Sequence, residues 1–307
     1  MFILNPDPYS LPCYHIGPFM TNDVTLNTNL HENNDIEYYL AERFKGKEFS
    51  YTYNGREAIH TALSCFNLHK DNVVTILTTS DNFYISGCVT HEIEKFCRWS
   101  RKIESETKVI FINHEFGYPY NELLKIKKLG FPIIEDCAHS FFSQDENNTT
   151  GTVGDFVIYS FPKMFPLQIG GLLVSNGESE IPELKLLSKG EKRYIINVLS
   201  KYINFKNEII DKRLTNYKYL ASKFSEIGLM ERFQLNDGIV PGVFMFRKGK
   251  HRIDLPELKK HFYAHGIQSS VFYGEESFFI PVHQALNETD LDYFLEVIKS
   301  FIKTSSK

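Results

Sequence analysis

The chain has few cysteines and no closely spaced pair of them. Its 307 residues include five cysteines, an odd number, at positions 13, 65, 88, 97 and 137. Disulfide scaffolds and structural zinc sites use several cysteines at short, regular spacings. We therefore expect neither a disulfide framework nor a metal site.

Long hydrophobic runs and an excess of positive charge are also missing. No apolar stretch approaches the roughly 18 residues that span a membrane, and residues 1–17 lack the basic and apolar segments of a signal peptide. The formal net charge is −4, whereas surfaces that bind nucleic acid are usually basic. The sequence predicts a cytoplasmic protein with no membrane or nucleic-acid partner.

The middle of the chain alternates between helix-like and strand-like patterns. Hydrophobic residues make up 42% of the sequence, which is enough to bury a sizeable core. We expect helices at 56–67, 89–102 and 120–129, and strands at 73–79, 108–113, 131–135, 155–160 and 171–175. Such alternation predicts an α/β fold with a mostly parallel sheet covered on both faces.

The two ends of the chain differ from this middle part. Prolines at 6, 8, 12 and 18 and the polar tract 21–35 favour an extended arm, followed by a short helix at 36–44. After a helix at 207–227, we expect a small α+β unit with strands 242–247 and 269–273 and helices 255–264 and 288–303. The predicted organisation is an arm (1–50), a large domain (51–200) and a small C-terminal domain (201–307).

One lysine lies between two short apolar segments. Lys163 follows the strand-like segment 155–160 and Pro162, and it precedes Met164, so we expect its ammonium group among apolar neighbours. Desolvation lowers the pKa of a lysine toward the range in which the amine is a nucleophile. Such lysines form Schiff bases with carbonyl compounds, although a solvated lysine at a strand end is the ordinary alternative.

Two upstream segments complement this lysine. Asp136 follows the apolar segment 131–135, and a carboxylate at the carboxyl end of a buried parallel strand faces a ligand crevice. The turn at Asn54, Gly55 and Arg56 opens a helix, whose first turn offers free N–H groups and a positive dipole end to a phosphate. Pyridoxal phosphate (PLP) requires a phosphate-binding site, a carboxylate and a desolvated amine.

Five segments, in the same order, resemble the DegT/DnrJ/StrS family of PLP-dependent sugar aminotransferases. They are NGREAIHTAL (54–63), IIEDCAHS (133–140), GDFVIYSFPK (154–163) with the glycines at 170 and 171, RLTNYKYL (213–220), and HGIQSSVFY (265–273) with IPVH (280–283). The resemblance implies the fold of aspartate aminotransferase, fold type I, with a large PLP-binding domain and a smaller C-terminal one.

The resemblance also implies roles for individual residues at the reacting end of the cofactor. Lys163 would hold PLP covalently and later carry protons, and Asp136 would keep the pyridine nitrogen protonated. His139 would lie near the phenolic oxygen, and Tyr84, with Phe83 in reserve, would stack on the ring. A structural role in the core or at the surface is the alternative for each of these residues.

Other matched positions concern the phosphate. Asn54, Gly55 and Arg56 stand where many relatives carry Ser-Gly-Thr in the phosphate-binding turn. Ser160 corresponds to a serine that contacts the phosphate. Glu135 is adjacent to Asp136 and points to the opposite face of the strand, so we leave it outside the site.

The implied activity is transfer of an amino group, from glutamate, to a keto group of a nucleotide-activated sugar, in polysaccharide or glycan biosynthesis. A homodimer is implied as well, because in relatives two chains enclose the cofactor. This chain is shorter than most relatives, and we find no Asn-Tyr-Arg-Met-like loop that would reach the partner's phosphate site.

Three alternatives remain open. A PLP-dependent sugar dehydratase of the same family would bind the same cofactor, although known examples replace the lysine with histidine. A catalytically silent relative would keep the fold as a binding or regulatory dimer. A cysteine hydrolase would use Cys137 and His139 as nucleophile and base.

Overall fold

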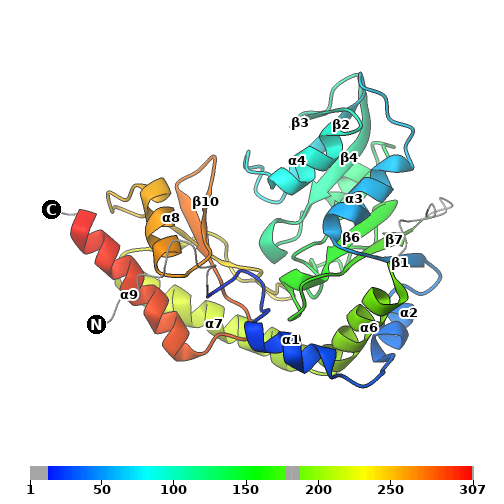
Figure 1. Ribbon diagram of the computed structural model, residues 1–307. Helices are drawn as coiled ribbons and strands as arrows, with labels where there is room; N and C mark the ends of the chain where they lie inside the picture. Colours follow the sequence, from blue (N-terminus) through cyan, green and yellow to red (C-terminus); the bar gives the residue numbers. More distant parts are fainter. Residues whose placement is uncertain (1–12, 177–180, 182–186, 306–307) are drawn as a thin grey trace.

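The computed structural model describes residues 13–176, 181 and 187–305 of the chain. Pro6, Pro8 and Pro12 of the expected arm therefore lie outside the described residues. Figure 1 shows two lobes, with the long helix α7 (Lys206–Glu226) running along their common base. Of the described residues, those from 48 to 175 form a seven-stranded sheet in one lobe, and those from 230 to 280 form a four-stranded sheet in the other.

The seven-stranded sheet has the strand order β1-β7-β6-β5-β4-β2-β3. Its strands are β1 (Glu48–Thr52), β2 (Val73–Thr78), β3 (Arg98–Ser100), β4 (Thr107–Asn113), β5 (Ile133–Asp136), β6 (Phe156–Ser160) and β7 (Gly171–Ser175). All neighbours from β3 to β6 pair parallel, whereas β7 runs antiparallel to both β6 and β1. The predicted α/β fold with a mostly parallel sheet is confirmed.

Helices cover both faces of this sheet. On one face, α3 (Gly55–Ser64) and α4 (Gly87–Glu94) pack against β2, β4 and β6, and α3 buries the apolar stripe that its 3.6-residue period predicts. On the other face, α2 (Asp35–Arg43) and α6 (Lys189–Ile203) pack together over β6 and β7, and the short α5 (Leu123–Lys127) covers β4. The strands β2 and β4 to β7 are largely buried on both faces, so a ligand of this sheet would bind at their carboxyl ends.

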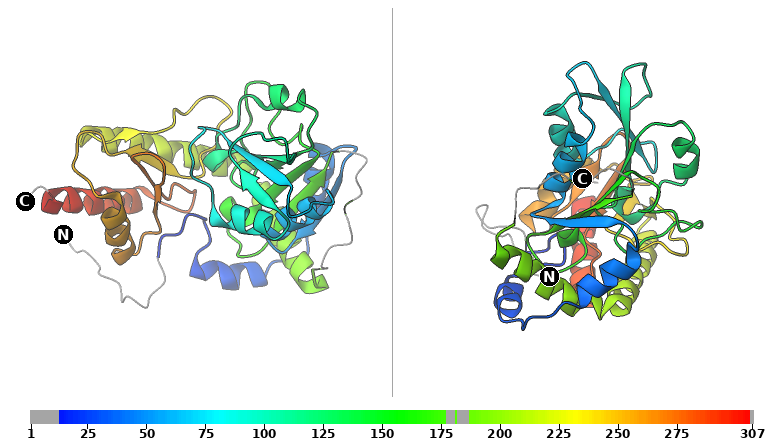
Figure 2. Two further views of the ribbon diagram at one scale, coloured as in Figure 1. Left: turned by 90° about the horizontal axis from the view of Figure 1, so that it is seen from above. Right: turned by 90° about the vertical axis from the view of Figure 1, so that its right-hand side faces the viewer.

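The smaller lobe is built on an antiparallel sheet. Its strands β8 (Met230–Glu231), β9 (Phe244–Arg247), β10 (Ser270–Phe272) and β11 (Ser277–Ile280) have the order β10-β11-β9-β8. Helices α7, α8 (Leu255–Ala264) and α9 (Glu288–Ser305) pack on it around a phenylalanine-rich core. Figure 2 shows α7 and α9 side by side in this lobe.

Two expectations from the sequence are wrong. The tract 21–35 is not extended throughout, because Thr21–Thr28 form the helix α1, whose first turn is closed by a 2.7 Å bond from the Met20 N–H to the Asp23 carboxylate. The helix expected at 89–102 ends at Glu94, and Arg98–Ser100 form β3, whose backbone pairs with β2. The strands β1, β8 and β11 are additional to the predicted ones. The proposed domain boundaries stay a prediction.

None of the helices in the described ranges combines the length and the apolar character needed to cross a bilayer.

Candidate active site

The polar residues singled out in the sequence converge where the parallel strands end. Asn113, Asp136 and Ser160 are the last residues of the neighbouring strands β4, β5 and β6. The start of α3 lies beside the end of β6, because a Cβ atom added to Gly55 would lie 3.2 Å from the Cβ of Ser160. The carboxyl edge of a parallel sheet is where ligands usually bind.

Asp136 is a buried carboxylate with two hydrogen-bond donors. Its Oδ2 accepts a bond of 2.8 Å from the side-chain amide of Asn113, and its Oδ1 accepts one of 3.0 Å from the N–H of Ala138. Burial raises the pKa of Asp136, while these donors and the nearby charge of Lys163 act in the opposite direction. Each oxygen keeps the capacity for another hydrogen bond.

Lys163 ends the short 3₁₀ turn η2 (Phe161–Lys163), which follows β6 directly. Its neighbours Phe161, Met164 and Phe165 are buried in the core of the large lobe. Burial lowers the pKa of the Lys163 amine, and the nearby Cys88 and Asp136 partly oppose this shift. The amine therefore lies within electrostatic reach of the Asp136 carboxylate, in surroundings that favour its neutral form.

The start of α3 has the features of a phosphate-binding site. Asn54 caps the helix, and its Oδ1 accepts a bond of 3.1 Å from the N–H of Glu57. Gly55 and Arg56 come next, in the first turn, where backbone N–H groups have no partner within the helix. The hydroxyl-bearing Ser160 lies against Gly55, whereas the Arg56 side chain is exposed. A glycine, a hydroxyl and free N–H groups are an arrangement that suits an anion.

His139 adds a polar atom that lacks a partner. Its Nδ1 is buried and makes no hydrogen bond to any of the described residues. Burial and the charges of Lys163 and Arg213 lower the pKa of His139 well below its usual value, so the ring is neutral. An unbonded buried nitrogen costs free energy unless a ligand completes it.

Tyr84 lies in an aromatic cluster between the lobes. Its ring stacks on Phe116, with centroids 6.2 Å apart, and on Tyr273, at 6.4 Å, while Phe116 also contacts His139 at 5.3 Å. Phe83 is exposed. The structure thus links Tyr84 to His139 through Phe116 rather than directly, and a role of Tyr84 against the cofactor ring stays a prediction.

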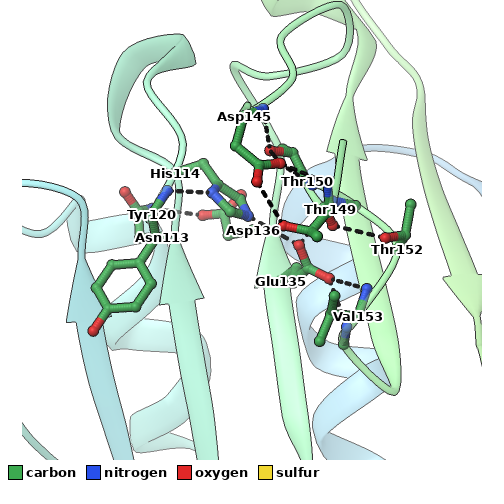
Figure 3. A network of polar contacts seen from close by, with 12 residues as sticks. Asn113, His114, Tyr120, Glu135, Asp136, Asp145, Thr149, Thr150, Thr152 and Val153 are labelled. Carbon is green, nitrogen blue, oxygen red and sulfur yellow. Dashed lines mark hydrogen bonds and ion pairs between the residues drawn. The ribbon is translucent and has the colours of Figure 1, made fainter. Parts of the chain in front are cut away.

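Glu135 lies on the other face of β5 from Asp136, as the alternation of a strand requires. It accepts hydrogen bonds from the N–H groups of Gly151, Val153 and Gly154, and Figure 3 shows it at the centre of a network with His114. Nδ1 of His114 accepts from the N–H of Tyr120, so its proton is on Nε2, which donates to Glu135 at 3.0 Å.

Side-chain atoms of His114, Glu135 and Cys137 approach one another closely enough for a metal site. The hydrogen bonds of Figure 3 already occupy both oxygens of Glu135 and both nitrogens of His114. Burial also raises the pKa of the Cys137 thiol well above its usual value. The cluster is therefore structural, and Cys137 is poorly suited to be the nucleophile of a hydrolase.

Sequence reasoning missed three residues near this edge. Asn113 ends a predicted strand beside Asp136, so the strand-end rule that selected Asp136 could have selected it. Cys88, at the start of α4, approaches Lys163 without any sequence signal. Arg213 begins the matched segment RLTNYKYL, but the sequence assigned it no role, and its bond to the Lys163 carbonyl comes from a helix 50 residues away.

These residues fit PLP. The unbonded Nδ1 of His139 needs a polar partner, and the close approach of Gly55 to Ser160 leaves room for oxygen atoms where a side chain would intrude. The donor set also matches the group, with N–H and hydroxyl donors for the phosphate, a carboxylate for a ring nitrogen and an amine for an aldehyde.

Comparison with known proteins agrees with this fit. Residues 95–195 match the model of the DegT/DnrJ/EryC1/StrS aminotransferase family. The chain is 35% identical over 86 residues to GDP-perosamine synthase of Escherichia coli O157:H7, a match that covers 26% of this chain and 23% of that protein. It is 24% identical over 172 residues to UDP-4-amino-4,6-dideoxy-N-acetyl-beta-L-altrosamine transaminase of Campylobacter jejuni, covering 50% and 46%.

Solved structures share the fold over nearly the whole chain. The protein Spr1654 of Streptococcus pneumoniae, in its PLP form, superposes with a TM-score of 0.71 at 15% identity, covering 97% of this chain and 99% of that one. The sequence matches, by contrast, span less than two thirds of the length of the curated relatives. Residues 95–195 are therefore similar to the DegT/DnrJ/EryC1/StrS aminotransferase family, and the fold of the chain is that of solved aminotransferases, one of them determined in its PLP form.

Proposed function

We propose that this protein is a PLP-dependent aminotransferase that transfers an amino group, from glutamate, to a keto group of a nucleotide-activated sugar. The observation that carries the proposal is that Lys163, Asp136 and the contact between Gly55 and Ser160 all lie at one edge of the sheet. The names of its relatives, GDP-perosamine synthase among them, support a nucleotide sugar as the acceptor.

Lys163 and Asp136 would act at opposite ends of the reacting part of the cofactor. PLP, when bound, supplies an aldehyde that condenses with amines and a ring that withdraws electrons. Lys163 would supply the amine that holds the cofactor, and its lowered pKa favours the neutral form, which attacks carbonyls and accepts protons. Asp136 would accept a hydrogen bond from the protonated ring nitrogen, in a buried place where such a bond is strong.

The remaining groups would hold and orient the cofactor. The first N–H groups of α3 and the hydroxyl of Ser160 would bind the phosphate. Neutral His139 would place its free Nδ1 against a polar atom of the ring. The Nδ1 atom of His139 and the Asp136 side chain are buried, and exclusion of water there strengthens their polar contacts.

Borohydride trapping tests the cofactor assignment. The purified full chain is incubated with PLP and reduced with borohydride, and the modified peptide is identified by mass spectrometry. We expect PLP to be fixed covalently on Lys163. Lys47, whose pKa burial also lowers, is the matched control, and Lys47→Ala should be trapped like the unmodified protein. Trapping that persists in Lys163→Ala contradicts the assignment.

Single-turnover experiments test the amino transfer. Glutamate added to the PLP-loaded protein should change its absorbance spectrum and release 2-oxoglutarate. A keto sugar linked to a nucleotide should then restore the original spectrum. If no amino acid changes the spectrum, the protein is the catalytically silent relative, and a dehydratase would instead release water from a sugar without consuming glutamate.

We further propose that the chain acts as a homodimer in the cytoplasm, as the family resemblance implies. Exposed apolar side chains on and beside α1, Met20, Val24 and Leu26, support a partner at this face. Met20 and Phe205 also line a groove of about 850 Å³ there. Light scattering at micromolar concentration should give the mass of two chains, and a monomer with full PLP occupancy contradicts the proposal. Cell fractionation tests the location.

A further inference from the structure

Arg213 is a buried cation whose hydrogen-bond partners are neutral. It lies in α7, and its side chain is fully buried. Nη2 donates to the carbonyl oxygen of Lys163 at 2.9 Å, Nη1 to that of Pro241 at 3.1 Å, and Nε to Oε1 of Gln284 at 2.8 Å. Burial lowers its pKa to about 9.

This placement costs free energy that simple packing would not require. A buried charge is tolerated only when its donors are well matched, and a carboxylate partner is the usual solution. An apolar residue of similar volume would fill the same space without desolvating a charge. What the guanidinium provides here is a rigid fork that holds several oxygens in fixed positions.

Gln284 extends the same contact to the next peptide. Its Oε1 accepts from Arg213, and its Nε2 donates to the carbonyl oxygen of Met164 at 2.8 Å. The pair therefore binds two consecutive carbonyls, those of Lys163 and Met164. The turn that carries them is a single 3₁₀ turn, so these long-range bonds add to a local structure that is weak by itself.

Arg213 also connects this turn to the small lobe. α7 runs along the base of both lobes (Figure 1). Pro241 precedes β9, and Gln284 follows β11, so both belong to segments flanking the small sheet. A single side chain thus ties the turn after β6 to two segments that are more than 70 residues downstream of it in the sequence.

We propose that Arg213, together with Gln284, is a positioning residue that sets where the Lys163 amine lies by holding the main chain of that turn. The role deepens the proposed function, since it concerns the lysine that would hold PLP. If the turn loosens, the amine of the half-buried Lys163 moves further toward water. The desolvation that favours its neutral form is then reduced.

Chemical labelling of the cofactor-free full chain tests this role directly. Trace acetylation with acetic anhydride at a series of pH values, read by mass spectrometry, gives the pKa of the Lys163 amine. We expect Arg213→Met to raise this pKa by about one unit, toward that of a solvated lysine. Trapping of PLP on Lys163 should become about tenfold slower, because a small displacement of a reacting group is costly.

Arg43 provides the matched control. It is a partly buried arginine that also donates to a main-chain carbonyl, that of Phe141, at 2.6 Å, and to the hydroxyl of Tyr159. Arg43→Met should lose stability as well, but the pKa and trapping rate of Lys163 should stay within about twofold of the unmodified protein. A purely structural role for Arg213 would leave both readouts unchanged in the folded variant, and that result would overturn the proposal.

Two further variants test the proposal if Arg213→Met does not fold. Arg213→Lys keeps the charge but lacks the fork, and Gln284→Met removes only the bonds to Arg213 and Met164. Both should shift the pKa of Lys163 in the same direction, and an unshifted pKa in both contradicts the inference. The labelling needs no cofactor, so a protein that fails to bind PLP would refute the proposed function and leave this result standing.

Discussion

The side-chain amide of Asn113 donates a hydrogen bond of 2.8 Å to the carboxylate of Asp136, and the two residues are direct partners in the pairing of β4 with β5. The bond favours the ionised form of a carboxyl group whose burial favours the neutral form. Asn113 therefore helps to keep Asp136 charged where a cationic ring nitrogen would meet it.

Replacement of Asn113 should weaken cofactor binding. In Asn113→Leu, one oxygen of Asp136 loses its donor, and we expect the affinity for PLP to fall by about tenfold, as for loss of a bond to a charged group. Absorbance titration measures this. Asn204→Leu is the control, because Asn204 bonds to Asp35 at 2.7 Å on another surface, and its affinity for PLP should not change. Equal affinities in the two variants would contradict a role for Asn113.

Gly55→Ala should obstruct the proposed phosphate-binding site. The added methyl group would lie 3.2 Å from the Cβ of Ser160, closer than ordinary van der Waals contact. We expect PLP to bind at least about tenfold more weakly, whereas pyridoxal, which lacks the phosphate, should be little affected. Gly190→Ala, in the first turn of α6 with open space around the position, is the control. Equal losses for PLP and pyridoxal would argue against a phosphate at this helix.

Glu135→Gln should destabilise the large lobe. The substitution places an amide N–H₂ where backbone N–H groups of Gly151, Val153 and Gly154 donate. We expect a loss of about 3 kcal/mol in the free energy of unfolding, measured in urea. Glu92→Gln, which breaks an ion pair with the more exposed Lys95, should cost less than about 1 kcal/mol.

We also predict that Glu135, His114 and Cys137 bind no metal ion. Because hydrogen bonds engage Glu135 and His114 fully, a chelator should leave the melting temperature of the unmodified protein unchanged. A decrease on chelation, restored by zinc, would mean that the cluster with Cys137 binds an ion after all.

His283 should make the folded state sensitive to acid. Its side chain is buried, its Nε2 bonds to the carbonyl oxygen of His15 at 3.0 Å, and burial lowers its pKa from 6.5 to about 3. Between these pH values the unfolded chain binds a proton that the folded chain does not. Stability is therefore lost as the pH falls through this window, by about 1.4 kcal/mol per pH unit.

Urea unfolding at several pH values checks this slope. His283→Gln can keep the bond to His15 without titrating, so we expect its stability to fall less steeply with acid than that of the unmodified protein. His69→Gln, at an exposed position, should follow the unmodified protein. Parallel curves for the protein and its His283→Gln variant would show that His283 is not responsible.

The sequence predicted those features that depend on neighbours along the chain. The apolar period of residues 58–63 identifies α3, and the strand-end rule places Asp136 at the sheet edge. The helix α1 was not predicted, since Thr21–Thr28 are polar and show no apolar stripe. The strand β3 resembles a continuation of α4 in sequence, and only its pairing with β2 makes it a strand.

The unpredicted part of the site depends on contacts between distant segments. In the sequence Arg213 is an ordinary helix residue, and only the folded chain brings it to the carbonyl oxygen of Lys163. Tyr84 occupies the place in the sequence where a stacking residue is expected, but aromatic residues of the small lobe surround its ring. Composition alone cannot separate such alternatives in a chain with 26 Phe and 17 Tyr.

The edge strand β1 pairs only with β7, which joins it to β6 across more than 100 residues of chain. Gly171 begins β7, and a Cβ atom there would lie 2.5 Å from Oγ1 of Thr52, so the two segments meet without space between them. The proposed phosphate-binding site at Gly55 includes Ser160 of β6, so it is incomplete until β6 and β7 have joined the sheet. If PLP binds there as proposed, its binding reports that β6 and β7 have joined the sheet, whereas the small lobe follows later in the chain.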